Sequence, residues 1–340
     1  MKVARFLGNK TFEVKDLPQL HAGPGELLLR NKVCGVCGTD VHIYHGEPGS
    51  ADVCPPVVLG HEYSAEVAEV GEGVTGFAVG DHVTVDPNIY CGSCEPCQNG
   101  KKQLCEHMEA IGVTRDGGFG EYSVIPASQA FKLDSDVPFE YAAMAEPLAC
   151  CIHGIDLAGI RPGQKVCVVG GGAIGLIMVQ LSKLSGAAKI ALSEPNEKRR
   201  QVALQLGADV AIDPTQPDYK ERFQEAMGSG ADVVIECVGN VPAVKSAFQF
   251  AGKGATILLF SVPKVDSTFD LPLFDIYKKE LAVKGSFVNP DTHARAVALI
   301  NSGKVDFAPI ITHRFTLEQL PEAIAMQMSE ESIKVVVVAE

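Results

Sequence analysis

The sequence has little of what a membrane-bound or exported protein needs. No uninterrupted apolar run approaches the roughly 18 residues of a membrane-spanning helix. The first residues, MKVARFLGNK, lack the apolar core of a signal peptide. These two absences predict a cytoplasmic protein without a membrane partner.

An excess of positive charge is also missing. The chain has 29 Lys and Arg residues against 42 Asp and Glu residues, which gives a net charge of −13. A negative field of this size repels polyphosphate, and the sequence contains no local basic run that offsets it. The composition therefore predicts no nucleic-acid partner.

Repeats and low-complexity segments are absent as well. The 34 glycines and 20 prolines follow no period, which excludes a collagen-like chain. Hydrophobic residues make up 46% and charged residues 21%, a composition that excludes disorder as the dominant state. A length of 340 residues predicts about two domains.

Cysteine is plentiful, with 11 residues. In the cytoplasm the thiol pool keeps cysteines reduced, so a disulfide framework is not expected. Metal binding or burial must account for them.

The pattern of apolar residues changes twice along the chain. From residue 26 to about 126, short apolar runs alternate with Gly, Pro and Asp, which predicts strands and tight turns. From about 152, strand-like and helix-like segments alternate, which predicts a parallel sheet covered by helices. After about 284 the alternation stops, and we expect a helix at 292–303, a turn and helix at 311–329, and a final strand at 333–340.

A glycine motif follows the first strand of the alternating part. Gly170, Gly172 and Gly175 fit G-x-G-x-x-G between a strand and a helix, the pattern of a dinucleotide-binding loop. Glu194 ends the next predicted strand, 22 residues after Gly172, where an acid can accept hydrogen bonds from the adenosine ribose. The alternative is a glycine-rich turn beside a Glu that caps a helix.

Four cysteines lie close together in CGSCEPCQNGKKQLC. Cys91, Cys94, Cys97 and Cys105 can close a tetrahedral shell by themselves, which is typical of a structural zinc site. An iron–sulfur cluster is the rival, but the spacing and the absence of Pro after Cys105 disfavour it. A chance grouping of structural thiols is the remaining alternative.

A second possible metal site is dispersed along the chain. Cys37, His61, Glu62 and Glu146 offer a thiolate, an imidazole and carboxylates. Such a mixed shell can leave zinc an open position for a substrate. Each residue, taken alone, is more often an ordinary surface or core residue than a metal ligand.

The order of these motifs resembles the zinc-containing medium-chain dehydrogenase/reductase family. The resemblance runs through CGVCGTDVH, GHEYSAEVAEVGEGVTGFAVGDHV, the four-cysteine lobe, DGGFGEY, AEPLA and GGGAIG. Glu146 in the EPL segment resembles the branch with sorbitol and other polyol, threonine and butanediol dehydrogenases.

The resemblance implies roles for the dispersed residues. Cys37 and His61 are expected to bind a catalytic zinc, with Glu62 and Glu146 completing or exchanging in the shell. Thr39 is expected to hydrogen-bond the substrate hydroxyl, and His42 to end a proton relay through the cofactor ribose. The alternatives are a turn residue for Thr39 and an exposed polar residue for His42.

The resemblance also implies an α/β architecture of two domains. Residues 1–150 and 285–340 would form a GroES-like, β-rich catalytic domain with a structural zinc lobe at about 88–108, and residues 151–284 a Rossmann domain with a doubly wound parallel sheet. The expected ligands are NAD and two zinc ions. Besides the glycine loop and Glu194, the residues expected to contact NAD are Ile174, Arg199, Phe260, Ser261, Val262, Ser286, Phe287 and Val288.

The function implied is NAD-dependent oxidation of a secondary alcohol on a polyol, sugar alcohol, sugar acid or amino alcohol by a homo-oligomer. Val288 and Ile43 stand where sorbitol dehydrogenases carry an Arg and an aromatic residue, which argues against sorbitol itself. The alternatives are a primary-alcohol dehydrogenase and a non-catalytic nucleotide sensor. NAD is favoured over NADP because Glu194 would repel a 2′-phosphate, while Arg199 and Arg200 on a helix could face solvent.

Overall fold

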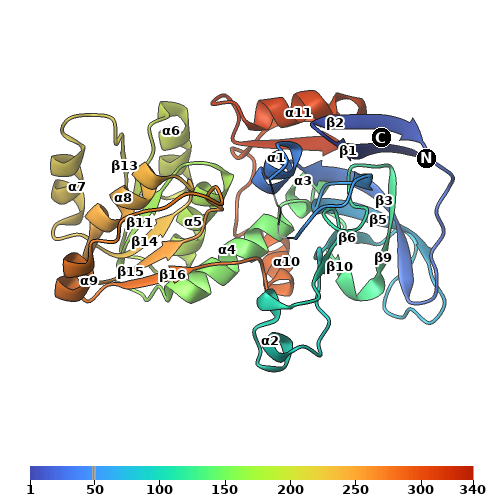
Figure 1. Cartoon of the computed structure of the whole chain (residues 1–340), viewed down its shortest axis with the longest axis horizontal. Helices are drawn as coiled ribbons and strands as arrows, with labels where there is room; N and C mark the ends of the chain where they lie inside the picture. Colours follow the sequence, from blue (N-terminus) through green and yellow to red (C-terminus); the bar gives the residue numbers. More distant parts are fainter. Residues whose placement is uncertain (48, 50, 340) are drawn as a thin grey trace. The chain divides into compact units, whose positions relative to one another are not determined.

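The computed structural model describes residues 1–47, 49 and 51–339 and divides the chain into two compact units. One unit comprises Met1–Ala149 and Val288–Glu340, and the other comprises Cys150–Phe287. Figure 1 colours the chain from its blue N-terminus to its red C-terminus, and the first unit contains both ends.

The first unit is built mainly from β-strands, as the short apolar runs predict. Its elements up to residue 149 are β1 (Lys2–Gly8), β2 (Thr11–Asp16), β3 (Glu26–Gly35), α1 (Gly38–Tyr44), β4 (Val57–Val58), β5 (Glu62–Val70), β6 (His82–Val85), β7 (Asn88–Ile89), α2 (Glu95–Gln98), η1 (Lys102–Leu104), β8 (Glu109–Ala110), β9 (Tyr122–Pro126), η2 (Ala127–Gln129), β10 (Ala130–Lys132), α3 (Phe139–Ala142) and the start of α4 (Ala145–Ala158). The later elements are α10 (His293–Asn301), β17 (Ile311–Thr316), η3 (Leu317–Gln319), α11 (Leu320–Gln327) and β18 (Lys334–Val338).

Strand β3 organises the main sheet of this unit. It pairs antiparallel with β5, β9 and β18, and the sheet has the order β10-β6-β5-β3-β18-β17, with β9 off this path. Leu27, Leu29 and Tyr63 from β3 and β5 are fully buried in the core. The C-terminal strand β18 therefore lies directly beside β3, although about 300 residues separate them in sequence.

The second unit contains the predicted parallel sheet. Its order is β13-β12-β11-β14-β15-β16, and all neighbouring strands run parallel. The strands are β11 (Lys165–Val169), β12 (Lys189–Ser193), β13 (Val210–Ile212), β14 (Ala231–Glu236), β15 (Ala251–Leu259) and β16 (Ala282–Gly285). The helices between them are α5 (Ala173–Leu184), α6 (Glu197–Leu206), α7 (Tyr219–Met227), α8 (Val241–Phe250) and α9 (Leu273–Lys279).

The strand order of this sheet reverses between β11 and β14. Strands β12 and β13 extend to one side of β11, and β14, β15 and β16 extend to the other. Ligands of such sheets bind beyond the carboxyl ends of the strands at this switch point. The glycine motif follows β11 directly, so it lies at that position.

One predicted element is wrong. The segment 311–316 was expected to be a turn before a helix, but it forms β17, which pairs parallel with β18. Its sequence, ITHRFT, has only two large apolar residues, and its strand conformation depends on the neighbouring strand.

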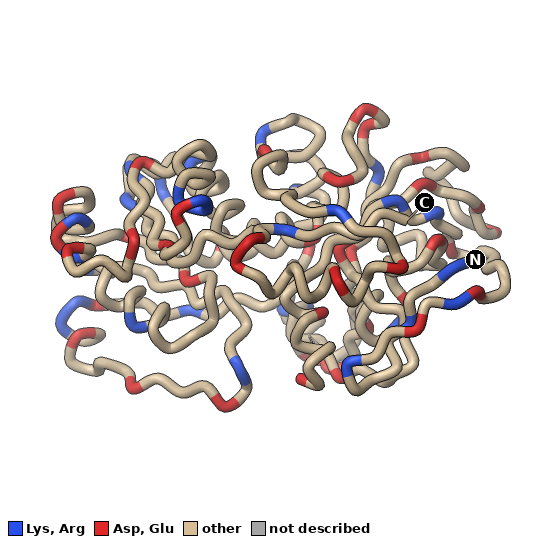
Figure 2. Tube along the Cα trace, turned by 90° about the horizontal axis from the view of Figure 1, so that it is seen from above, with Lys and Arg blue, Asp and Glu red and all other residues tan. Residues whose placement is uncertain are grey.

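Charged residues of both signs are interspersed along the traces of the two units (Figure 2). None of the described helices has the length and apolar character required to cross a membrane.

Candidate active site and metal centres

Three side chains that could bind a metal ion meet at the end of β3. Cys37 follows β3 and caps α1, while His61 and Glu62 stand at the start of β5. Because Glu62 pairs with Gly35 across the two strands, the segments are held together. The ligand atoms of Cys37, His61 and Glu62 all lie within 4.8 Å of one another. A thiolate, an imidazole and a carboxylate are donors that zinc accepts, and three protein ligands leave a fourth position for a substrate.

Asp40 of α1 supports this group. Its Oδ2 accepts a hydrogen bond from the backbone N–H of Cys37 at 2.9 Å, and its Oδ1 lies 3.7 Å from Nδ1 of His61. Among the described residues, Asp40 Oδ1 and His61 Nδ1 are buried without a hydrogen-bond partner. A carboxylate that faces one nitrogen of a histidine orients the ring so that the other nitrogen can bind a metal.

The electrostatics of the group favour a cation. Burial raises the pKa of the Cys37 thiol, and the charge of Glu62 raises it further. Burial acts to lower the pKa of His61, but Cys37 and Asp40 together outweigh it and raise this pKa well above its usual value. Several acidic groups thus share a buried space, and a divalent cation would neutralise them.

Lys334 is a neighbour that the sequence analysis missed. Its ammonium group pairs with Oε2 of Glu62, and both side chains are buried. The contact crosses β3 at Gly35, where a side chain would collide with both Glu62 and Lys334. Lys334 stands at the start of β18, and no local sequence pattern connects it with Glu62.

Glu146 is placed differently from the other three candidates. It lies buried in the first turn of α4, and its charge contributes to the raised pKa of His61. The group of ligand atoms within 4.8 Å of one another does not include Glu146. The structure therefore brings Cys37, His61 and Glu62 together and leaves Glu146 outside that group.

The two remaining catalytic candidates lie on α1. Thr39 is half-buried in its first turn. His42 is also half-buried, and its Nδ1 pairs with Oε2 of Glu47. The backbone N–H of Glu47 donates to the His42 carbonyl at 2.9 Å, which keeps the two residues together. Sequence analysis missed Glu47, although an acid just beyond the end of a short helix is a usable signal.

The four clustered cysteines form a second group. The sulfur atoms of Cys91, Cys94, Cys97 and Cys105 all lie within 4.8 Å of one another. In the part of the chain that the structure describes, none of the 11 cysteines forms a disulfide bond. This local group has the composition of a closed structural zinc site.

Backbone amides around this group favour the thiolate form. The N–H groups of Ser93 and Cys94 donate to the sulfur of Cys91 at 3.5 and 3.4 Å. These bonds, that of Ser93 foremost, lower the pKa of Cys91 to about 5. The N–H of His107 donates to the sulfur of Cys105 at 3.4 Å. Because zinc binds thiolates, the lobe is well arranged for it.

The glycine loop connects β11 with α5. Gly170 has φ of +103°, a conformation that favours glycine. At Gly175 a side chain would collide with the carbonyl oxygen of Gly170, so a glycine allows the close approach of helix and strand. At Gly172 the space is open, as a loop that receives a pyrophosphate requires. Ile174 lies in the first turn of α5.

Glu194 faces this loop from the end of β12. Its Oε2 accepts a hydrogen bond from the backbone N–H of Gly171 at 2.6 Å, and its Oε1 accepts one from the N–H of Asn196 at 2.8 Å. The residue is buried, and a carboxylate can accept further bonds from ribose hydroxyls with its remaining lone pairs.

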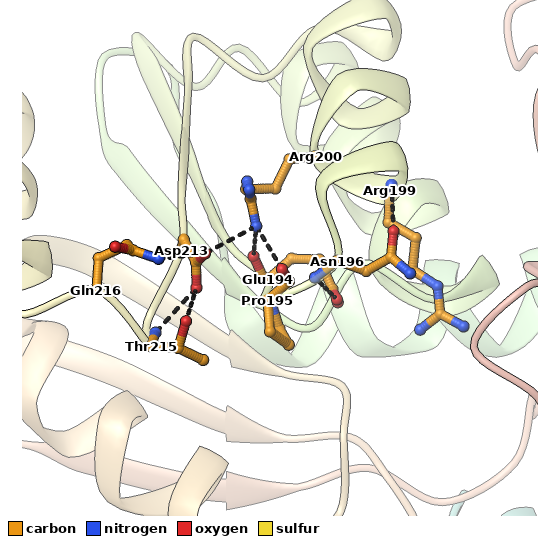
Figure 3. Close-up of polar contacts among 8 residues, drawn as sticks. All are labelled: Glu194, Pro195, Asn196, Arg199, Arg200, Asp213, Thr215 and Gln216. Atoms are coloured by element: carbon orange, nitrogen blue, oxygen red, sulfur yellow. Dashed lines mark hydrogen bonds and ion pairs between the residues drawn. The ribbon is translucent and has the colours of Figure 1, made fainter.

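The two arginines of α6 differ in their surroundings (Figure 3). Arg200, which could have faced solvent on this helix, is mostly buried, since only 16% of its side chain is exposed. Its Nη1 donates to the carbonyl oxygens of Glu194 and Pro195 at 2.8 and 2.6 Å. The guanidinium of Arg199 lies on the other side of Asn196. The side chains of consecutive residues in a helix point in different directions, so the two arginines contact different neighbours.

The other predicted cofactor residues follow the last two strands of the parallel sheet. Phe260, Ser261 and Val262 come after β15, and Ser286, Phe287 and Val288 come after β16. The hydroxyl of Ser261 donates to Oε2 of Glu236. The structure places both segments at carboxyl ends of strands, the edge at which the glycine loop also lies.

Two known protein families match parts of the chain. Residues 23–135 match the alcohol dehydrogenase GroES-like domain, and residues 173–302 match the zinc-binding dehydrogenase family. The chain is 38% identical over 335 residues to a sorbitol dehydrogenase of Halalkalibacterium halodurans, covering 96% of each chain. It is 36% identical over 332 residues to an L-threonine 3-dehydrogenase of Bacillus licheniformis, covering 96% of this chain and 95% of that one.

A solved structure from Sinorhizobium meliloti 1021 is similar throughout its length. It is described as a zinc-binding dehydrogenase bound to NADP, and it has a TM-score of 0.94 and 38% sequence identity. The match covers 99% of this chain and 98% of the other. The expected combination of a GroES-like domain and a Rossmann-type parallel sheet is thereby confirmed.

Proposed function

The chain belongs to the zinc-containing medium-chain alcohol dehydrogenase family, and from this premise we propose that it oxidises a secondary alcohol to a ketone with NAD as the hydride acceptor. The observation that carries the proposal is the group formed by Cys37, His61 and Glu62, whose ligand atoms lie within 4.8 Å of one another. Three protein ligands would leave the fourth position of a zinc ion to a substrate. Named relatives that act on sorbitol and threonine favour a polyol or amino alcohol with a secondary hydroxyl.

Both metal sites suit zinc in their donor sets. Cys37, His61 and Glu62, with Glu146 nearby, would hold the catalytic ion, and the four cysteines the structural one. When bound, zinc supplies a Lewis acid that makes the substrate hydroxyl more acidic, and NAD supplies the hydride acceptor.

The residues around the first site would orient the metal ligands and transfer the proton of the substrate hydroxyl. Asp40 orients His61, and Lys334 holds Glu62. Thr39 would accept the proton of the substrate hydroxyl in a hydrogen bond and pass it on, and His42 would deliver it to solvent. The contact of Glu47 with Nδ1 of His42 would restrict the rotation of the ring and leave its other nitrogen for the transfer.

A substrate panel tests the proposed reaction directly. NADH formation at 340 nm should be fastest with one of the secondary alcohols among polyols, sugar acids, small diols and amino alcohols. Zinc-loaded enzyme that oxidises only primary alcohols would contradict the substrate class, and a lack of turnover with every alcohol would contradict the activity.

His42→Ala is expected to slow alcohol oxidation most at low pH. A proton relay matters most where hydroxide is scarce, so the loss should shrink as the pH rises. A decrease of about 10²-fold in kcat at low pH is typical for the loss of a positioned acid–base group. The pH dependence of kcat measures this, and His45→Ala, an exposed histidine on the same turn, is the matched control. If the His42→Ala profile has the shape of the parent profile, His42 is no relay.

The parent enzyme should prefer NAD to NADP by a hundredfold or more in kcat/KM. A 2′-phosphate about 4 Å from the Glu194 carboxylate would cost roughly 4 kcal/mol at an effective dielectric constant of 20. Glu194→Gln keeps an acceptor oxygen but removes the charge, and it should reduce the preference at least tenfold. The measurement is kcat/KM with each cofactor. NADP must be included because a similar structure is bound to it. Equal or better use of NADP by the parent would overturn the assignment.

We also propose that the chain forms homo-oligomers. Strand β16 is an edge strand of the parallel sheet, and Val283 within it is an exposed apolar residue. An exposed edge of this kind can pair with another chain. Light scattering should give a multiple of 36.1 kDa, and Val283→Lys should shift it toward the monomer. A parent mass of one chain at micromolar concentration would contradict the proposal.

A further inference from the structure

Arg200 is tied to the main chain of the turn that carries Glu194. Its Nη1 lies 2.8 Å from the carbonyl oxygen of Glu194 and 2.6 Å from that of Pro195. The same nitrogen lies 3.5 Å from Oδ2 of Asp213. Figure 3 shows the guanidinium between the turn and Asp213. One cationic group therefore connects three oxygen atoms from two neighbouring segments.

Asp213 is itself held in place. It follows β13 and accepts hydrogen bonds from the backbone N–H and the hydroxyl of Thr215 at 2.9 and 2.7 Å. These bonds, with that of the Thr215 hydroxyl foremost, lower the pKa of Asp213. Gln216 donates to its other oxygen at 3.2 Å. Only 14% of the Asp213 side chain is exposed, so the carboxylate offers Arg200 a fixed, charged anchor.

The turn between these anchors presents Glu194 to the glycine loop. The backbone N–H of Glu194 donates to the carbonyl of Ile212 at 2.9 Å, which joins the ends of β12 and β13. The carboxylate of Glu194 instead accepts a hydrogen bond from the backbone N–H of Gly171 in the glycine loop. Arg200 thus holds the main chain of Glu194, while Gly171 and Asn196 hold its side chain.

We propose that Arg200 is a positioning residue for cofactor selection, which holds the Glu194 carboxylate where it binds the ribose hydroxyls of NAD(H) and repels the 2′-phosphate of NADP(H). The inference rests on the proposed function, since it assumes a nicotinamide dinucleotide on the glycine loop. Arg200 touches neither the ribose nor the phosphate in this role. It acts through the turn that comprises Glu194, Pro195 and Asn196.

A direct role for Arg200 makes the opposite prediction. An arginine that bound the 2′-phosphate would favour NADP(H), and its removal would weaken NADPH binding most. A positioning role means that its removal frees Glu194, so NADH loses hydrogen bonds and NADPH loses repulsion. The geometry favours positioning, because Nη1 is already engaged by two carbonyl oxygens and Asp213.

The test is the binding of NADH and NADPH to the zinc-loaded, full-length enzyme, followed by nicotinamide fluorescence. Arg200→Leu should raise the Kd of NADH about tenfold, the usual effect of losing a hydrogen bond to a charged group. The Kd of NADPH should change less than twofold or fall. Arg200→Lys, which keeps a cationic donor, should restore part of the NADH affinity. Arg222→Leu removes the same charge at an exposed position of α7 and should leave both affinities unchanged.

Asp213→Asn provides a milder variant in case Arg200→Leu folds poorly. This variant removes the charged anchor but keeps an oxygen that can accept the hydrogen bonds of Thr215. It should change the ratio of the Kd of NADH to the Kd of NADPH in the same direction as Arg200→Leu, by a smaller factor. Thermal unfolding of each variant shows whether its fold is intact.

Two results would overturn the inference. A larger loss of NADPH affinity than of NADH affinity in Arg200→Leu, each measured against the parent, would make Arg200 a phosphate ligand. Equal weakening of both cofactors, or no change in either, would leave it a structural residue of α6. The parent protein separates these results from a failure of the proposed function, since a parent that binds neither cofactor contradicts the function itself.

Discussion

Cys37→Ser is expected to remove one of two zinc ions per chain and to reduce kcat/KM about a thousandfold. The structure contains two separate groups of side chains that could hold a metal ion, and Cys37 belongs only to the group of three. Three ligands would leave the fourth position of zinc to a substrate. Without its thiolate the site keeps His61 and Glu62, and Glu62 is already paired with Lys334. Loss of Lewis-acid catalysis worth about 4 kcal/mol corresponds to that factor in rate.

Metal analysis and steady-state kinetics measure this effect together. The parent should contain about two zinc ions per chain and Cys37→Ser about one. Cys54→Ser makes the same chemical change at an exposed cysteine outside both groups, so it should keep two ions and full activity. A parent with one ion, unchanged in the Cys37→Ser variant, would refute the catalytic site. The Tm of Cys37→Ser should lie within a few degrees of the Tm of the parent.

Cys105→Ser should have the reverse profile, with a large loss of stability and a small change in turnover per folded molecule. Binding of zinc at a closed four-cysteine site contributes directly to folding. The lobe consists of two short strands, β7 and β8, a four-residue helix, α2, and a single 3₁₀ turn, η1, so little apolar burial can replace the metal. A loss of about 4 kcal/mol lowers Tm by roughly 10 °C in a domain of this size.

Calorimetry and an active-site titration with zinc-loaded protein distinguish the two sites. The variant should retain the catalytic zinc, because Cys37 and Cys105 belong to different groups. Cys54→Ser again provides the control for a lost thiol. A Cys105→Ser protein with the parent Tm and no turnover would contradict a structural role for the lobe.

The sequence alone determined what depends on short stretches of chain. Cys91 to Cys105 span fifteen residues, so their sulfur atoms can meet whatever the rest of the protein does. The glycine motif depends on the same locality, since its first and third glycines are required by one turn between a strand and a helix. The alternation of strands and helices from residue 152 likewise predicted the parallel sheet, because buried apolar runs and helical spacing are local signals.

Tertiary structure decided the surroundings of the dispersed site. Lys334 and Glu62 are 272 residues apart, and they meet because β18 inserts beside β3. The run KVVVV predicts a buried strand but is compatible with many neighbours, so its partner cannot be derived from the sequence. The same limit applies to Glu146, whose separation from the other three ligand atoms depends on the packing of α4.

Arg199 and Arg200 show this limit within a single helix. Both residues are arginines, but the side chains of neighbouring helical residues point about 100° apart. One of them can therefore face the turn that contains Glu194 while the other does not. Packing of α6 against the ends of β12 and β13 sets that direction and connects Arg200 with Glu194 and Asp213. The sequence specifies which chemical groups are available, whereas strand pairing and helix packing decide which of them come within hydrogen-bond distance.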